Sequence, residues 1–319
     1  MKIDTGRLFA FAWDVVHRLP DALARGIFDA VAIVAHTARI GSVRQLEANL
    51  ARVRPELDAR GLRRLSRSGM RSYLRYYCES FQLPGMSEAQ VDARVRVIGH
   101  EQIVAELQAG RSVVAGLGHT GNWDLGAAWF TRHVGRTVTV AEKLEPEQLF
   151  REFLAFREGL GLVIVPYQKG SGVLRRLISE AKRIPAFIPL LADRDLSTSG
   201  LEVQVNGHGM RVAPGPAALA LATRSMLLPV SLHYERITGE RRRRAGSPWG
   251  VVMQFHAPVA VPDEPREEAL LTMTQAWVDP VAASVSRHPQ DWHMLQKVFT
   301  ADLDHDRLAR SRTAEELAP

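Results

Sequence analysis

The chain has 319 residues, of which 46% are hydrophobic and 24% are charged. This balance is typical of a soluble globular protein and excludes a largely disordered one. The formal net charge of +6 favours an anionic partner, and nucleic acid, anionic lipid and the phosphates of a coenzyme all meet that requirement.

The single cysteine, Cys78, excludes an intrachain disulfide and any metal site built from several cysteines. Because it lies in an aromatic segment, we expect a small buried side chain rather than a nucleophile. The low cysteine content also fits the cytoplasm. The histidines show no metal-ligand spacing with cysteine or carboxylate, so no metal is predicted.

Residues 1–94 are predicted to form an N-terminal helical, membrane-facing region. Helices over 7–18 and 21–37 are separated by Leu19-Pro20, because proline disfavours helix in the preceding residue. Further helices are predicted over 43–53, 61–81 and 88–94. No window reaches the roughly 20 uncharged apolar residues of a membrane span, and no signal peptide is evident at the start. We therefore expect the protein to remain in the cytoplasm.

Residues 95–300 alternate short apolar runs with helical stretches, which predicts one α/β core domain together with the preceding helices. The expected fold is a central, mostly parallel or mixed β-sheet flanked by helices, with the N-terminal helical extension. Residues 265–300 are predicted to be helical and 301–319 to be a flexible tail. The predicted strands are 112–117, 137–141, 162–165, 186–191, 227–233 and 251–256, and the helices between them are 123–133, 146–159, 173–182 and 216–224.

The segment from Ser112 to Asp124 carries the most informative motif. A predicted strand runs into Gly118, and His119 follows at its carboxyl end, where ligands bind in open α/β sheets. Asp124 begins the next helix and can fold back to the imidazole, fixing its tautomer and leaving the other nitrogen as a base. The alternative is that His119 caps a helix or fills a polar niche and that Asp124 is a first-turn acid favoured by the helix dipole.

His119-Thr-Gly-Asn-Trp-Asp124 resembles the H-x4-D/E motif of the lipid A lauroyl/myristoyl acyltransferases, and most closely their actinobacterial phosphatidylinositol mannoside branch. The resemblance covers roughly residues 5–300. Four further matches follow in order: Phe156-Arg157-Glu-Gly-Leu-Gly, Leu190-Leu-Ala-Asp193-Arg194-Asp195-Leu, the segment from Gly200 to Ala220, and His288-Pro-Gln-Asp-Trp292.

The resemblance implies that His119 deprotonates an acceptor hydroxyl, with Asp124 orienting it and Asp193 as a second acid near the histidine. Asp193 is alternatively a helix-capping or salt-bridging acid partnered by Arg194. Arg157 and Arg194 are expected to hold phosphates or polarise the thioester carbonyl, unless they are solvated surface residues.

The remaining substrate-binding candidates are weaker signals. Asn122 lies within the motif, and Glu202 on a predicted hairpin is expected to line the acceptor groove. Gly207, Gly209 and Gly215 are either phosphate-cradling or ordinary turn residues.

Acyl-CoA, with palmitoyl as the chain, is the expected donor, and a mannose hydroxyl of phosphatidylinositol mannoside is the implied acceptor. No cofactor is expected besides this co-substrate. The helices at 7–18 and 21–37, and the basic loop at 240–244, are expected to contact an anionic membrane surface. The alternatives are that the helices pack on the core and close the acyl channel, and that the basic loop is a solvated hairpin tip. The predicted location is therefore peripheral, on the cytoplasmic face of the inner (plasma) membrane.

Three alternatives remain open at this stage. In the first, the acyl donor is an acyl-carrier protein instead of a coenzyme. In the second, the histidine activates water and the protein is an acyl-thioester hydrolase. A serine hydrolase is not favoured, because the chain lacks a G-x-S-x-G motif. The third alternative is a non-enzymatic binder of anionic lipid or nucleic acid, and no nucleic-acid motif supports the latter.

Overall fold

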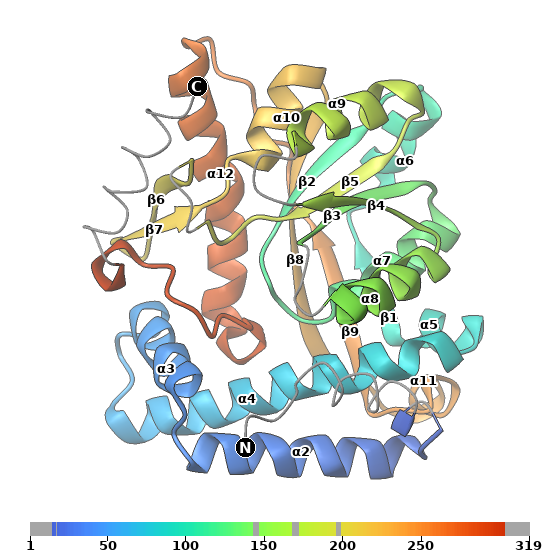
Figure 1. Ribbon diagram of the computed structural model, residues 1–319, viewed down its shortest axis with the longest axis vertical. Helices are drawn as coiled ribbons and strands as arrows, with labels where there is room; N and C mark the ends of the chain where they lie inside the picture. The colour runs from blue at the N-terminus through green and yellow to red at the C-terminus, as the bar shows by residue number, and fades with distance from the viewer. Residues whose placement is uncertain (1–14, 17, 143–146, 168–171, 196–198, 304–319) are drawn as a thin grey trace.

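The computed structural model describes residues 15–16, 18–142, 147–167, 172–195 and 199–303. In this part of the chain the centre is a seven-stranded mixed sheet of order β1-β9-β8-β2-β5-β3-β4 (Figure 1). Neighbouring strands are parallel except β8 and β9. The strands are β1 (Val95–Ile98), β2 (Val113–Leu117), β3 (Thr137–Glu142), β4 (Leu162–Tyr167), β5 (Phe187–Leu191), β8 (Met226–Arg236) and β9 (Trp249–Phe255).

Helices cover both faces of this sheet. One face packs against α9 (Val173–Arg183), α10 (Gly215–Thr223) and α12 (Arg266–Arg287), and the other against α6 (Glu101–Gln108), α7 (Trp123–His133) and α8 (Glu147–Gly159). Every side chain of β2 is buried, and successive residues serve opposite cores: Val114 belongs to the first and Val113 and Ala115 to the second. This alternation follows from the two-residue period of a strand.

The N-terminal helices form a separate layer across the carboxyl edge of the sheet (Figure 1). The layer consists of α2 (Asp21–Thr37), α3 (Gly41–Val53), α4 (Ala59–Gln82) and α5 (Glu88–Arg94). The side chain of Asp58 accepts a hydrogen bond from the Gly61 amide and so caps the start of α4. From α4, Tyr76 and Glu79 reach the beginning of α7, so this layer contacts the segment that follows β2.

A two-stranded hairpin, β6 (Leu201–Val205) and β7 (His208–Val212), packs on α12. Its turn is Asn206-Gly207, with φ of 50° and 76°. Two positive φ values are what a two-residue hairpin turn of type I′ requires. Gly207 is therefore a turn residue. Gly209 lies in β7, where an added Cβ would come within 2.5 Å of Glu202 Oε1. Of the three glycines proposed to cradle a phosphate, Gly215 is the one at a helix start.

The predicted fold class is confirmed, and all six predicted strands are present. Two predicted elements differ from the structure, one in its length and one in its type. The last helix ends at Arg287 because Pro289 follows, and the predicted basic loop is largely a short helix, α11 (Gly239–Ala245). Two short elements, β1 and α6, were not predicted as such. The predicted helix over 7–18 and tail over 301–319 fall largely outside the described residues.

Taken singly, none of the helices in the described ranges has the length and apolar content of a membrane span. The neighbouring helices α2 and α3 meet that test only when joined, and they are bent by 84° at their junction.

Replacing Gly116 with alanine tests the packing of β2 against α12. The added Cβ would lie 2.6 Å from the Trp277 ring, which is fully buried, so the ring or the strand must shift. We expect the variant to lose about 1–3 kcal/mol of unfolding free energy, measured by guanidinium denaturation. Gly26→Ala is the control, since its Cβ would meet nothing within 4 Å in α2 and should leave stability unchanged or higher. Equal stability of the two variants would contradict this packing.

Candidate active site

His119 and Asp193 lie side by side at the carboxyl edge of the sheet. Strands β2 and β5 are parallel neighbours with Leu117 paired to Leu191, so each residue comes two positions after the paired strand ends. The ring Nδ1–H of His119 donates to Asp193 Oδ1 at 2.5 Å, and the His119 amide donates to Asp193 Oδ2 at 2.9 Å. The resemblance implied only that Asp193 lies near His119, and the structure places the two in direct contact.

Asp193 is buried and its second oxygen has another donor. The indole Nε1–H of Trp292 reaches Oδ2 at 2.9 Å. Burial by itself raises the pKa of Asp193, but the charge of the His119 ring and these hydrogen bonds outweigh it, so the pKa lies below its ordinary value. Asp193 is therefore an ionised acceptor that fixes the His119 tautomer with the proton on Nδ1.

The other ring nitrogen of His119, Nε2, is available for chemistry. Among the described residues it has no hydrogen-bond partner, and the side chain is 26% exposed. Gly118 leaves space for this arrangement, because an added Cβ would lie 3.1 Å from Asp193 Oδ2. An imidazole with one nitrogen held by a buried carboxylate and the other open is the arrangement of a general base.

The prediction that Asp124 orients His119 was wrong. Asp124 begins α7 and its carboxylate points to α4 and α8, where it accepts from Arg157 Nε at 2.9 Å and Tyr76 Oη at 2.8 Å. In the described part of the chain, none of its hydrogen bonds goes to His119. The first turn of α7 rotates the side chain away from the end of β2, and Arg157 is the charged partner that it meets.

Arg157 therefore has a partner within the protein. Burial lowers the pKa of its guanidinium, but the Asp124 charge outweighs this, and the pKa lies above the ordinary arginine value. Its expected role as a phosphate holder conflicts with this geometry, since its bonded N–H groups are used by Asp124. The pair ties α8 to α7 directly behind His119.

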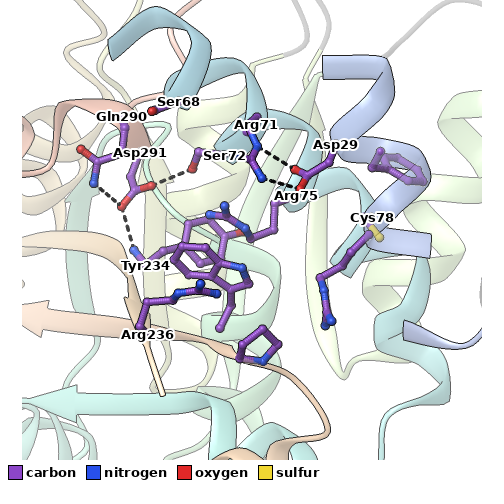
Figure 2. Close-up of a pocket in the computed structure, with 14 residues that line it drawn as sticks. Asp29, Ser68, Arg71, Ser72, Arg75, Cys78, Tyr234, Arg236, Gln290 and Asp291 are labelled. Atoms are coloured by element: carbon purple, nitrogen blue, oxygen red, sulfur yellow. Dashed lines mark hydrogen bonds and ion pairs between the residues drawn. The ribbon is translucent and has the colours of Figure 1, made fainter. Parts of the chain in front are cut away.

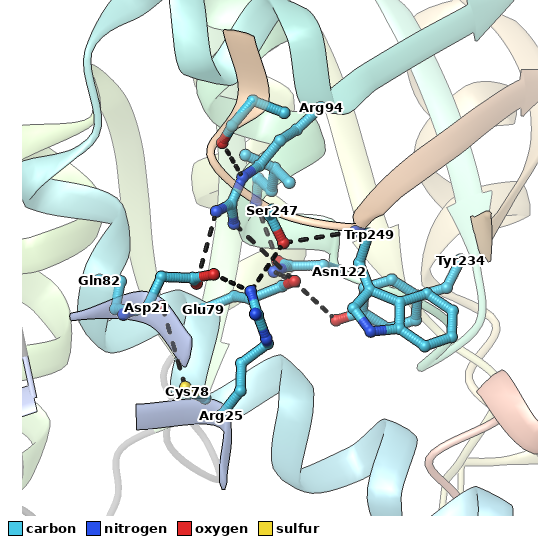
Figure 3. A network of polar contacts seen from close by, with 12 residues as sticks. Asp21, Arg25, Cys78, Glu79, Gln82, Arg94, Asn122, Tyr234, Ser247 and Trp249 are labelled. Atoms are coloured by element: carbon cyan, nitrogen blue, oxygen red, sulfur yellow. Dashed lines mark hydrogen bonds and ion pairs between the residues drawn. The ribbon is translucent and has the colours of Figure 1, made fainter. Parts of the chain in front are cut away.

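The substrate-binding prediction for Asn122 was also wrong. Asn122 is fully buried, accepts from the Leu125 amide as the N-cap of α7, and donates to Glu79 Oε2 at 2.9 Å. Figure 3 shows Asn122 and Tyr234 converging on Glu79, which also accepts from the Tyr234 hydroxyl at 3.0 Å. The side-chain amide of Asn122 is therefore used within this network and is not available to a ligand.

Arg194 and Glu202 lie outside the His119–Asp193 pair. Arg194 is partly exposed and comes within 3.7 Å of Glu142, so it remains near the site entrance but does not pair with Asp193. Glu202 is exposed on β6 and accepts from the Thr300 hydroxyl at 3.0 Å. No bond of the described chain links Glu202 to the histidine.

Trp123 and His293 are neighbours of His119 that the sequence did not single out. The Trp123 ring meets the His119 ring edge to face at 5.6 Å between centroids, and the His293 amide donates to the His119 carbonyl at 2.8 Å. In the sequence, the position of His293 directly after the motif that ends at Trp292 was the only indication that it lies near the site. Its ring Nε2 lies 3.2 Å from the Ser72 hydroxyl.

A narrow apolar channel of about 50 Å³ begins beside the site, on the sheet face covered by α7 and α8. It passes Asp124 and Arg157 and continues between side chains from the sheet and α7. The apolar lining includes Leu117, Phe130, Leu162, Phe187, Leu191 and Val230. Leu117 and Trp123 line it, and these residues lie two positions before and four positions after His119, so this space lies near the candidate base.

The described residues contain no group of three or more histidine, cysteine or acidic side chains placed to hold a metal. Cys78 is buried, as expected, and burial raises the pKa of its thiol to about 12. A thiol with such a pKa is not ionised near neutrality and is a poor nucleophile.

Comparisons with known proteins agree over nearly the whole chain. The family model described as bacterial lipid A biosynthesis acyltransferase matches residues 4–301. A phosphatidylinositol mannoside acyltransferase of Mycolicibacterium smegmatis is 36% identical over 305 residues, covering 96% of this chain and 94% of the relative. One of Mycobacterium tuberculosis is 36% identical over 307 residues, with 96% and 92% covered. A solved 1-acyl-sn-glycerophosphate acyltransferase of Thermotoga maritima covers 85% of this chain and 97% of its own, at 18% identity and a TM-score of 0.38, a weak likeness.

His293 should make the protein less stable at acid pH. Burial, and then the charge of His119, lower the pKa of His293 from 6.5 to about 3. In the unfolded chain His293 takes up a proton as the pH falls below 6.5, whereas the folded state keeps the ring neutral. Protonation therefore favours the unfolded state, and the free energy of unfolding falls on acidification. His293→Gln should therefore reduce the loss of unfolding free energy between pH 7 and pH 5 by about 2 kcal/mol.

The measurement is urea denaturation at both pH values, and only the difference between them is compared. His208→Gln replaces an exposed histidine of β7 and serves as the control. An identical pH dependence in His293→Gln and wild type would contradict the predicted burial of a neutral imidazole.

Proposed function

The chain belongs to the bacterial lipid A biosynthesis acyltransferase family, and on this premise we propose that it transfers a palmitoyl group from acyl-CoA to a mannose hydroxyl of phosphatidylinositol mannoside. The acceptor class is supported by the mannoside acyltransferases that are 36% identical over 96% of the chain. The observation that carries the chemistry is the hydrogen bond between His119 Nδ1 and the buried Asp193 carboxylate.

In this mechanism His119 Nε2 removes the proton of the acceptor hydroxyl as its oxygen attacks the thioester carbonyl carbon. The imidazolium that forms is stabilised by Asp193, which holds Nδ1–H. Collapse of the tetrahedral intermediate breaks the carbon–sulfur bond, and the imidazolium returns its proton to the departing thiolate. The products are the acylated sugar and free thiol, and no covalent acyl-enzyme is required.

The fatty acyl chain occupies the apolar channel beside the site. Its lining is apolar apart from a few polar side chains, and Leu117 directly precedes the turn that carries the base. Since the channel is narrow, a long chain must displace side chains to enter, and its depth then limits chain length.

Helix α2 is proposed to lie on the membrane surface. Its exposed residues between 22 and 34 are uncharged and apolar and recur at helical spacing: Ala22, Leu23, Gly26, Ile27, Ala30, Val31 and Val34. Such a one-sided stripe is typical of a helix lying in the interface of a bilayer. Three exposed arginines of α11 lie near the start of α2, since Arg242 acts electrostatically on Arg25, and these would meet anionic headgroups. Peripheral attachment to the cytoplasmic face of the plasma membrane follows from this proposal.

Transfer of labelled palmitate from palmitoyl-CoA to phosphatidylinositol mannoside tests the chemistry. His119→Ala and Asp193→Asn should each lower kcat by about 10²–10⁴-fold, because one removes the base and the other its orienting acid. His119→Ala should retain the melting temperature within a few degrees, whereas Asp193→Asn places an NH2 group against N–H donors and should also lower it, so kcat is compared on the folded fraction of each variant. Asp124→Asn is the contrast: it leaves the Arg157 charge buried without its partner, so it should lower stability first.

The outcomes separate the alternatives. Free palmitate released without acylated lipid would favour a hydrolase, and turnover only with an acylated carrier protein would replace the donor. A kcat of Asp193→Asn equal to that of wild type would contradict the His119–Asp193 assignment.

Co-sedimentation with phosphatidylinositol-containing vesicles tests the membrane surface. Introducing serine at Leu23, Ile27, Val31 and Val34 should weaken binding by about tenfold or more, because the apolar stripe would no longer favour the interface. The control places serine at two exposed apolar residues elsewhere, Val261 and Leu271. Equal binding of both variants would rule out α2 as the docking helix.

A further inference from the structure

A second pocket, of about 550 Å³, lies between α2, α4 and the ends of β8 and β9 (Figure 2). It is distinct from the active site, because Tyr76 and Ser80 of α4 face Asp124 whereas Arg71 and Arg75 face this pocket. Four arginines and two aspartates are found among the described residues that line it. The pocket is therefore electropositive.

Two of these arginines are already paired. Arg71 makes two hydrogen bonds to Asp29, at 3.1 and 2.6 Å, and Figure 2 shows this pair at the rim. Arg25 forms an ion pair with Asp21 and donates to the Ser247 hydroxyl at 3.4 Å. These contacts hold the Arg71 and Arg25 side chains in the wall of the pocket.

Arg75 and Arg236 stack on aromatic rings, and no carboxylate in the described part of the chain is bonded to either. Both guanidinium groups lie over the Trp249 ring, at 3.6 and 4.4 Å from its centroid, and Arg75 also lies over Tyr234 at 4.8 Å. Within the described residues, neither side chain forms a hydrogen bond or an ion pair. Stacking on an aromatic ring holds the plane of a guanidinium while its N–H edge stays free to donate.

The nearby acids are committed elsewhere. Asp291 accepts from the Ser72 hydroxyl at 2.7 Å and from the Tyr234 amide at 2.9 Å, and burial raises its pKa. Glu235 is bonded to Arg96 and Arg241. Asp291 acts on Arg75 only through space, so two like charges share one indole without a bonded counter-charge, and a bound anion would relieve their repulsion.

We propose that this pocket binds a phosphate or phosphodiester group through the N–H edges of Arg75 and Arg236, with Trp249 holding both. Guanidinium groups match phosphate because they offer paired donors in one plane. The phosphate site follows from the side chains alone and does not depend on the proposed function.

The source of the phosphate is a phospholipid headgroup. Phe28 and Asp29 of α2 line the pocket, and Ile27 and Val31 on the same helix belong to the exposed apolar stripe. A bilayer that contacts the stripe would bring headgroups to the pocket mouth. This choice rests on the proposed membrane function, and coenzyme phosphates are the competing source.

Calorimetric titration of the full chain with glycerophosphoinositol, a soluble phosphodiester, tests the site without any acyl donor. Substituting both Arg75→Gln and Arg236→Gln should weaken binding about tenfold or more. Substituting both to lysine keeps the charge but removes the paired donors, so it should weaken binding to a smaller extent. The matched control is Arg175→Gln with Arg176→Gln, two exposed arginines of α9 on the far side of the sheet.

Weaker binding of glycerophosphoinositol in the Arg75/Arg236 glutamine variant but not in the Arg175/Arg176 control, with an unchanged melting temperature, supports the phospholipid site. Weaker binding of coenzyme A with unchanged glycerophosphoinositol binding keeps the phosphate site but overturns the phospholipid source. If wild type binds neither probe, or both arginine pairs matter equally, the proposal is wrong. His119→Ala should bind the probe normally, so failure of the transferase mechanism would be seen separately.

Discussion

The buried carboxylate of Asp193 requires several hydrogen-bond donors, and the segments around the carboxyl edge of the sheet are arranged to supply them. Two come from His119, through its amide and its ring, and one comes from the Trp292 indole. Because β2 and β5 are neighbours in register, the acid and the base meet without a long loop. The segment after α12 must also return to this edge, and an isolated bridge between Thr120 and Trp292 holds it there.

A second buried charge, Asp124, has a different role. It pairs with Arg157 and accepts from Tyr76, so α4, α7 and α8 are tied together behind the base. Removing one partner of such a pair is costly, because the other charge remains desolvated. The acid of the H-x4-D motif thus supports the position of α7, while the carboxylate that contacts His119 is that of Asp193, which follows β5 and lies 74 residues further along the chain.

The N-terminal layer has two chemically different sides. The outer side of α2 is apolar and exposed, whereas α4 presents Tyr76 and Glu79 to the α7 segment and Arg75 to the second pocket. Glu79 joins these regions, since it accepts from both Asn122 and Tyr234 (Figure 3). An ordered path of side chains therefore connects the pocket wall to the helix that follows His119.

The sequence by itself determined the strands, most helices and the class of sheet, because these depend on local periodicity, and the turn at Gly118 singled out His119 as the candidate base. It also identified Asp193 and Trp292 within ordered motifs. Only the tertiary structure decided which acid meets His119: the spacing in the motif suggested Asp124, but the rotation of the first turn of α7 directs that carboxylate to Arg157. Likewise, Asn122 is a cap and Arg75 faces a pocket. Such facts depend on which side chains from distant segments compete for one partner, and local pattern carries no information about that competition.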